Sequence, residues 1–240
     1  GKDTCGDIVD SNVRSACFRV LGRAHLRVTT EAEGDGVGGG IVVPECLPLT
    51  GAERDLCVVN RVKTVGSAGE PQACLAVANS LLRRECVTFW ATAGWAEGLE
   101  QTVGVCELLS APARDECLFE VAENRAQSQF EQALELCWNA DATRPMCARH
   151  VVRIRVSGIL SEQHAQSFEV FVSQVEGLQP ALEKRDWPIG GVGLVHTLWS
   201  DAFQLLAAHA VVRGDVSRWT GLEAAFEPGD ARRTLWRDIL

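Results

Sequence analysis

The sequence lacks the excess of positive charge that proteins use to bind nucleic acids or anionic membranes. Its 240 residues carry 32 acidic and 23 basic side chains, which gives a formal net charge of -9. Phosphate backbones and anionic lipid headgroups attract proteins of the opposite sign. We therefore expect neither nucleic acid nor an anionic membrane surface as a partner.

Long hydrophobic runs are missing as well. A helix needs about 20 consecutive apolar residues to cross a bilayer. The best candidate segment, Val192 to Val212, is interrupted by His196, Asp201, Gln204 and His209. The sequence thus predicts no membrane-spanning helix, although its 46% hydrophobic content is enough for a substantial core.

Motifs of the common catalytic and metal sites are also absent. The sequence contains no C-x-x-C pair, no H-E-x-x-H motif, no G-x-S-x-G turn and no phosphate-binding P-loop. A G-x-G-x-x-G motif does occur at Gly34, Gly36 and Gly39, but Pro44 and Cys46 follow too closely for a dinucleotide-binding helix. We interpret that segment as a mobile loop, and we expect no catalytic residue, no metal site and no cofactor.

What the sequence does contain is regularly spaced cysteine. Ten cysteines form five close pairs, whose members are 10 to 12 positions apart, and none follows Cys147. Such regular cysteine without zinc-type spacing indicates disulfides, which form in oxidising compartments. The pairs are Cys5/Cys17, Cys46/Cys57, Cys74/Cys86, Cys106/Cys117 and Cys137/Cys147.

These pairs belong to a longer repeat with a period of about 30 residues. An arginine stands three residues before the second cysteine of every pair, at Arg14, Arg54, Arg83, Arg114 and Arg144. Four residues before that arginine, four of the five repeats have a helix-capping residue type, at Asp10, Thr50, Asn79 and Ser110. The pattern predicts one helical hairpin per repeat, whose first helix ends near the first cysteine and whose second helix begins at the cap.

We expect a disulfide between the two cysteines of the same repeat, because this pairing uses all ten cysteines in loops of similar length, whereas pairing between neighbouring repeats strands Cys5 and Cys147. A cystine needs Cα atoms about 4.4 to 6.8 Å apart, whereas roughly 11 residues of unbroken helix would separate them by about 16 Å. A turn must therefore lie between the two cysteines. A rival pairing joins the second cysteine of one repeat to the first of the next, as in Cys86 to Cys106 or Cys117 to Cys137, and it stays open because it also joins neighbouring helix ends.

The recurring arginine lies one turn into the second helix of each predicted hairpin. We expect its guanidinium to donate hydrogen bonds to the free carbonyls where the preceding helix ends. The alternative is a ladder of five arginines that binds an acidic ligand. A residue present in every repeat fits a role in folding better than a role in one binding site.

With its paired cysteines and its period of about 30 residues, the chain up to about residue 150 resembles the disulfide-bridged helical-hairpin repeat proteins related to tetratricopeptide repeats. The likeness is clearest in the two repeats that contain Cys106 to Cys117 and Cys137 to Cys147. The resemblance implies a stacked helical scaffold that binds other proteins.

The cysteine-free remainder of the chain has the apolar spacing of helices. One stripe is formed by Phe168, Phe171, Val172 and Val175, and another by Val195, Trp199, Ala202 and Leu206. We expect residues 158–240 to form a helical bundle that caps a repeat region of residues 1–157.

The candidate ligand-binding residues lie around one glycine-rich loop in this bundle. Gly190 and Gly191 lead directly into a helix, where backbone N-H groups can face an anion, and Trp187 and His196 flank them. The competing interpretation is structural: the glycines serve turn geometry, Trp187 packs in the core, and His196 and His209 are core residues of an apolar stripe.

The sequence predicts an all-α fold, in which disulfide-stapled helical-hairpin repeats are followed by a cysteine-free helical bundle. No signal peptide stands before Gly1, and arginine far outnumbers lysine in a chain without tyrosine, as is typical of GC-rich bacterial genomes. We expect a mature, exported bacterial protein of the periplasm, cell surface or extracellular space. Its expected role is to present the helical repeats to a protein partner, without being an enzyme.

Two alternatives remain for the function. One is an enzyme, or an obligate subunit of one, with its site between the repeats and the bundle. The other is a carrier of a small molecule or metal.

Overall fold

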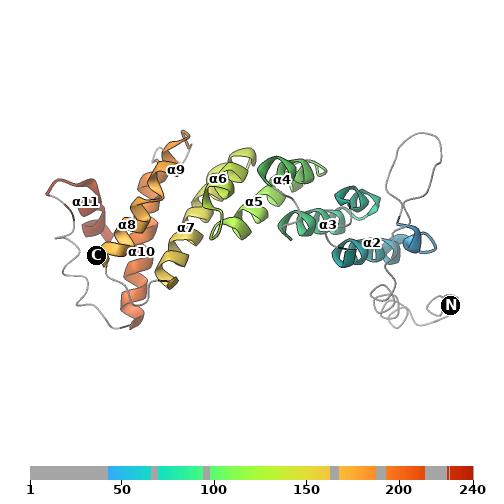
Figure 1. Cartoon of the computed structure of the whole chain (residues 1–240), viewed down its shortest axis with the longest axis horizontal. Coiled ribbons are helices and arrows are strands. Elements are labelled where there is room, and N and C mark those ends of the chain that lie inside the picture. Colours follow the sequence, from blue (N-terminus) through green and yellow to red (C-terminus); the bar gives the residue numbers. More distant parts are fainter. Residues whose placement is uncertain are drawn as a thin grey trace. The chain divides into compact units, whose positions relative to one another are not determined.

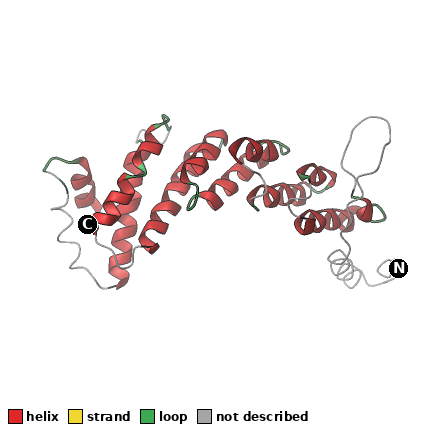
Figure 2. Ribbon diagram, viewed as in Figure 1, coloured by secondary structure: helices red, strands yellow, loops and turns green. Residues whose placement is uncertain are grey.

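Helices are the only regular secondary structure in the part of the chain that the structure describes (Figure 1, Figure 2). The structure, a computed structural model, describes residues 43–65, 70–93, 98–162, 168–187, 193–213, 226 and 228–239. The all-α prediction is confirmed for these residues. With η for a 3-10 helix, the elements are η1 (Pro44–Cys46), α2 (Gly51–Val65), η3 (Pro71–Ala76), α3 (Ser80–Thr92), α4 (Gly98–Cys106), α5 (Ala113–Arg125), α6 (Phe130–Asn139), α7 (Arg144–Glu162), α8 (Phe168–Glu176), α9 (Gln179–Glu183), α10 (Leu194–Arg213) and α11 (Ala231–Ile239).

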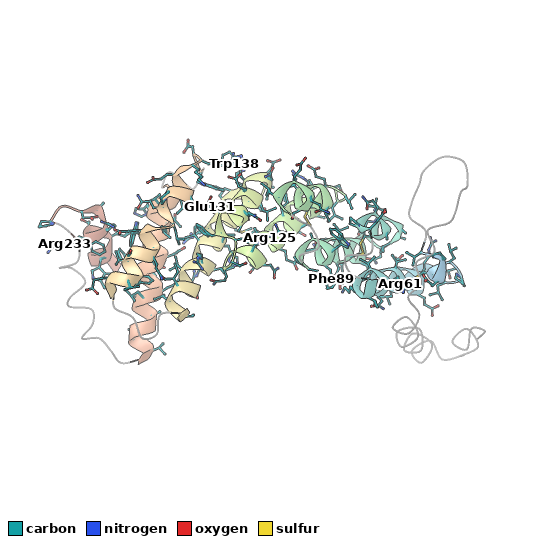
Figure 3. All side chains as sticks on the ribbon, viewed as in Figure 1. Arg61, Phe89, Arg125, Glu131, Trp138 and Arg233 are labelled. Atoms are coloured by element: carbon teal, nitrogen blue, oxygen red, sulfur yellow. A yellow bond between two sulfur atoms is a disulfide. The ribbon has the colours of Figure 1, made fainter. Side chains whose placement is uncertain are left out.

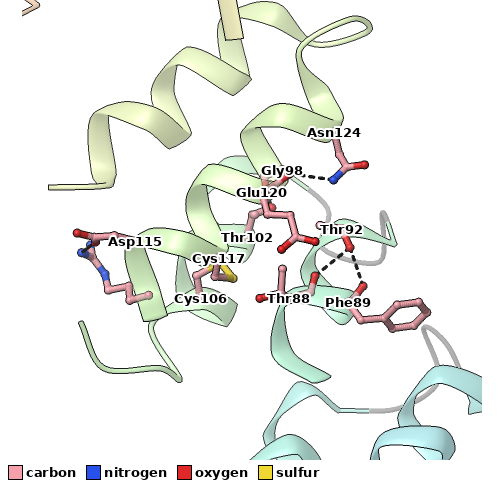
Figure 4. Close-up of a disulfide and its surroundings, with 11 residues drawn as sticks. Thr88, Phe89, Thr92, Gly98, Thr102, Cys106, Asp115, Cys117, Glu120 and Asn124 are labelled. Carbon is pink, nitrogen blue, oxygen red and sulfur yellow. Dashed lines mark hydrogen bonds and ion pairs between the residues drawn. A yellow bond between two sulfur atoms is a disulfide. The ribbon is translucent and has the colours of Figure 1, made fainter. Parts of the chain in front are cut away.

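Four of the five predicted disulfides are present, each within one repeat. They join Cys46 to Cys57, Cys74 to Cys86, Cys106 to Cys117 and Cys137 to Cys147, with Cα–Cα distances of 5.7, 5.6, 5.7 and 5.3 Å. Figure 4 shows the disulfide between α4 and α5. The rival pairing between neighbouring repeats is therefore wrong for these eight cysteines.

The remaining predicted pair, Cys5/Cys17, lies outside the described residues. The same holds for Asp10, Arg14 and the glycine motif of Gly34, Gly36 and Gly39.

The first helix of the hairpin is short in the second and third repeats. There the first cysteine lies in a 3-10 helix, η1 of 3 residues and η3 of 6 residues, whereas α4 and α6 are the first helices of the next two repeats. Pro44 and Pro71 occupy the first turns of η1 and η3. A helix can begin at proline but cannot extend upstream through it, because proline has no N-H to donate.

Helix α3 begins where the capping pattern predicts. The side chain of Asn79 accepts hydrogen bonds from the backbone N-H groups of Leu81 and Leu82, at 3.0 and 3.1 Å. Helix α2 likewise begins directly after Thr50. The sequence pattern therefore locates the start of the second helix in both repeats.

A buried carboxylate joins the second repeat to the third. Asp55 of α2 accepts hydrogen bonds from the N-H groups of Ala78 and Asn79, at 2.9 and 2.7 Å. Two turns further along α2, Lys63 pairs with Glu85 of α3 at 2.6 Å. Because these contacts advance along both helices in the same order, α2 and α3 run side by side in the same direction.

The predicted role of the recurring arginine is confirmed in one repeat. Arg83 Nε donates to the carbonyl oxygen of Val77, which ends η3, at 2.8 Å. Arg144 instead pairs with Asp141 at 2.6 Å, and Arg54 is exposed. A uniform capping role is therefore wrong, because the helices that precede the arginine differ in length and in the way they end.

The chain divides into two compact units, Gly1–Cys117 and Leu118–Leu240. The division expected from composition, between residues 157 and 158, falls inside α7, a continuous helix of 19 residues. Helix α7 packs against both α6, which carries Cys137, and the cysteine-free helix α10. The last cystine and the cysteine-free helices consequently share the second unit.

The core of the second unit is apolar and rich in aromatic rings. The long helices α7 and α10 pack along each other, and both predicted stripes contribute buried residues, Phe171 and Val175 from one and Trp199 and Ala202 from the other. Aromatic rings from α10, α11 and position 226 meet with centroids 5.2 to 6.3 Å apart, in a cluster of Trp199, Phe203, Phe226 and Trp236. Within the described residues, no helix combines the length and apolarity needed to cross a membrane.

Peptide mapping without reduction should recover one cystine per repeat, including Cys5 joined to Cys17. A mapped peptide that joins Cys86 to Cys106 would contradict the hairpin pairing.

Replacing both cysteines of the third repeat, Cys74→Ser with Cys86→Ser, should lower the free energy of unfolding by roughly 2 to 3 kcal/mol, because a short loop is no longer closed in the unfolded chain. Denaturant unfolding measures this loss.

Candidate functional site

A pocket of about 560 Å³ opens in the second unit between α8, α9, α10 and α11. Its wall contains the ring of Trp199 and the aliphatic side chains of Val195 and Leu235. Its polar groups come from four elements, and they are Glu176, Gln179, His196, Asp230 and Arg232. The pocket therefore combines one buried aromatic ring with two carboxylates and one guanidinium.

The guanidinium of Arg232 is held on several sides within this pocket. Its Nε and Nη2 donate to the Asp230 carboxylate at 2.9 and 2.6 Å, and its Nη1 donates to Glu176. Its Cζ lies 5.1 Å from the ring centroid of Trp199 and 4.9 Å from that of Phe226. We call these four partners, Glu176, Asp230, Trp199 and Phe226, the guanidinium cage.

Hydrogen bonding inside the cage changes the acidity of two groups. The side-chain hydrogen bonds from Arg232 lower the pKa of Asp230, and the hydrogen bonds to Asp230 raise the pKa of Arg232. Asp230 also accepts a hydrogen bond from Arg232 N at 2.8 Å at the start of α11. The ionised carboxylate thus fixes both the side chain of Arg232 and the first turn of α11.

Of the two candidate ligand residues that the structure describes, Trp187 and His196, it is His196 that lines the pocket. The expectation that it is a core residue is wrong, because its side chain is exposed. The buried residues Leu194, Leu198 and Trp199 occupy the packed faces of α10, which leaves position 196 on the solvent side. His209 lies on α10, but its side chain is outside what the structure describes.

Trp187 is buried elsewhere in the second unit, so the structural interpretation holds for this residue. Its ring meets Trp138 of α6 edge-on, with centroids 5.3 Å apart. Arg185 lies over Trp138 at 4.7 Å and pairs with Glu135 at 2.6 Å, and these contacts hold the chain before α10 against α6. Figure 3 labels Trp138. Gly190 and Gly191 lie outside the described residues.

The sequence does not predict that a carboxylate on α10 is buried. Asp201 is 1% exposed, and within the described residues neither of its oxygens accepts a hydrogen bond. Arg149 of α7 approaches it with Nη2 at 3.7 Å from Oδ1. This loose ion pair sits where α7 and α10 pack, and its two residues are separated by about 50 positions in the chain.

The first unit has a different feature, an exposed leucine on each of the neighbouring helices α2 and α3. Leu56 of α2 is 45% exposed and Leu81 of α3 is 60% exposed. Leu56 directly follows Asp55, and Leu81 stands two residues after Asn79. Because Asp55 accepts a hydrogen bond from Asn79 N, the two leucines lie at the same level of the paired helices.

Further along the same helix stripes, a lysine connects the two helices. Lys63 stands seven residues after Leu56, while Glu85 and Phe89 stand four and eight residues after Leu81. The ammonium of Lys63 pairs with Glu85 and lies 5.1 Å from the Phe89 ring centroid. We call these five residues the α2–α3 surface, and Figure 3 labels Phe89 on it.

Comparison with known proteins finds no relative. No protein family, no curated protein and no solved structure matches the chain. Among the described residues, no three His, Cys, Asp or Glu side chains are grouped so that they could hold a metal ion.

The contribution of Asp230 to stability should disappear in acid. Because the hydrogen bonds from Arg232 make its pKa lower in the folded than in the unfolded state, the stabilisation is fully present above the unfolded pKa and is lost as the pH falls through the folded pKa. Asp230→Asn should therefore lower the free energy of unfolding by about 1 kcal/mol near neutral pH and by almost nothing in acid that protonates Asp230 in the folded protein. Thermal unfolding across this pH range measures the difference, and an equal loss at both ends would contradict the assignment.

Proposed function

We propose that this protein is an exported, non-enzymatic binding protein whose disulfide-fastened hairpins present the α2–α3 surface to a protein partner. The cystines support an oxidising location, and the proposal places the protein in the periplasm, at the cell surface or outside the cell. A relation to tetratricopeptide-like repeat proteins belongs to this proposal. It is supported by consecutive bridged hairpins whose second helices, α2 and α3, run in the same direction.

The observation that carries the proposal is the exposure of Leu56 and Leu81 on rigidly held helices. A single exposed leucine is ordinary on a protein surface. Here two leucines lie at the same level on neighbouring helices, and each helix is bridged near its middle by a cystine, at Cys57 and at Cys86. Fixed apolar side chains bind a partner without the entropy loss of ordering a loop.

The charge of the surface indicates what kind of segment it binds. Lys63 and Glu85 pair with each other, so the surface contributes no net charge to attract a strongly acidic or basic segment. Leucine side chains and the ring of Phe89 favour an apolar contact face instead. We propose a partner that docks the apolar face of an amphipathic helix along α2 and α3.

The test combines site-specific crosslinking with substitution. A photo-crosslinking residue at position 81 should capture one protein in the organism that produces this chain, through a segment with helical apolar spacing. A synthetic peptide of that segment should bind the wild-type protein. The double variant Leu56→Glu with Leu81→Glu should weaken this binding by at least about tenfold, because it places charge in an apolar contact.

A matched control uses exposed polar positions of the same unit. Thr64→Glu with Gln72→Glu adds the same two charges and should leave the peptide affinity unchanged. Both double variants should keep the wild-type melting temperature, since the replaced side chains are exposed. Equal affinity of the leucine variant and the wild type, or a crosslinked segment without apolar periodicity, would sink the proposal.

A further inference from the structure

The guanidinium cage has the chemistry of a recognition site for arginine. Carboxylates bind the edge of a guanidinium through parallel hydrogen bonds, and aromatic rings bind its face. Arg232 receives both kinds of contact, from Asp230 and Glu176 at its edge and from Trp199 and Phe226 at its face. In this structure a side chain of the same chain occupies the site.

The site remains open to the solvent while Arg232 occupies it. The side chain of Arg232 is 28% exposed and that of Glu176 is 45% exposed. A pocket of about 560 Å³ adjoins them, which is room for an entering side chain. A ligand can therefore reach the cage without prior unfolding of the second unit.

The charges of the pocket select a cation. Glu176 and Asp230 contribute two negative charges, and Arg232 contributes one positive charge. A ligand with a free carboxylate would meet this excess negative charge close by, at an energetic cost. An arginine within a peptide, whose main-chain carboxylate is in an amide bond, avoids that cost.

Helix α11 does not depend on Arg232 for its position. Trp236, one turn further along α11, is fully buried, with its ring centroid 5.2 Å from that of Phe203. This anchor keeps α11 against α10 when the side chain of Arg232 rotates out of the cage. Displacement of Arg232 thus requires a side-chain movement and leaves the helix packing intact.

We propose that the pocket binds an arginine side chain of a peptide or protein ligand, which takes the place of Arg232 in the cage. Arg232 then acts as an internal competitor that keeps the site filled in the absence of ligand. This proposal concerns the second unit, and it does not rest on the α2–α3 surface.

The experiment measures binding of two blocked tripeptides, acetyl-Gly-Arg-Gly-amide and acetyl-Gly-Lys-Gly-amide, by calorimetry or NMR titration. Removal of the internal competitor by Arg232→Met, which keeps the aliphatic stem, should tighten binding of the arginine peptide by at least about tenfold. The lysine peptide should bind at least about fivefold more weakly, because an ammonium group cannot bridge both carboxylates as a planar guanidinium does. Free L-arginine should also bind more weakly than the arginine peptide, on account of its carboxylate.

Controls separate the cage from a general effect of charge. Arg153→Met removes an exposed arginine of α7 and should leave the affinity at the wild-type value. Adding Glu176→Gln to Arg232→Met should weaken binding of the arginine peptide at least about fivefold relative to Arg232→Met alone. If Arg232→Met proves unstable, the same comparison is made as the rise in melting temperature that each peptide causes. Equal binding by wild type and Arg232→Met, or equal binding of the arginine and lysine peptides, would overturn the proposal.

Discussion

The cystine at the base of each hairpin is the constraint on which the first unit depends. The first helices of the second and third repeats have only 3 and 6 residues, too few to be stable by themselves. The cystine holds each of them against the following helix at a Cα–Cα distance of 5.6 to 5.7 Å. Asp55 then joins one hairpin to the next, and this link sets the level at which Leu56 and Leu81 lie. The proposed binding surface is thus a consequence of covalent bridging followed by one buried carboxylate.

The second unit depends on burial of apolar surface instead. Helices α7 and α10, of 19 and 20 residues, pack along each other and need only the cystine at the start of α7. Their packing tolerates Asp201, whose burial beside a loosely placed Arg149 costs stability that the surrounding apolar contacts offset.

Sequence spacing predicts those parts of the structure that are encoded locally. The distance between paired cysteines requires a turn between them, and the four described disulfides obey it. The cap of α3 and the role of Arg83 are also local, and both are confirmed. The spacing does not predict how long the first helices are, and in two repeats they are short 3-10 helices that begin at Pro44 and Pro71.

Sites that are built from residues far apart in the chain are not predicted by sequence spacing. Glu176, Trp199 and Arg232 come from three different helices, and no spacing along the chain relates them. The placement of Trp187 against Trp138 likewise requires that α6 and the chain before α10 be brought together. His196 is a candidate from the sequence because it stands beside a glycine loop, whereas in the structure it lines the pocket because of the orientation of the first turns of α10.

Amide hydrogen exchange before and after reduction tests most directly whether cystines hold the first unit and burial holds the second. Under reducing conditions that leave the second unit folded, the amides of α2 and α3 should lose their protection while those of α10, which contains no cysteine, keep it. The difference is expected because each cystine removed weakens only the hairpin that it closes. Equal loss of protection in α2, α3 and α10, or full protection of α2 and α3 after complete reduction, would contradict the account.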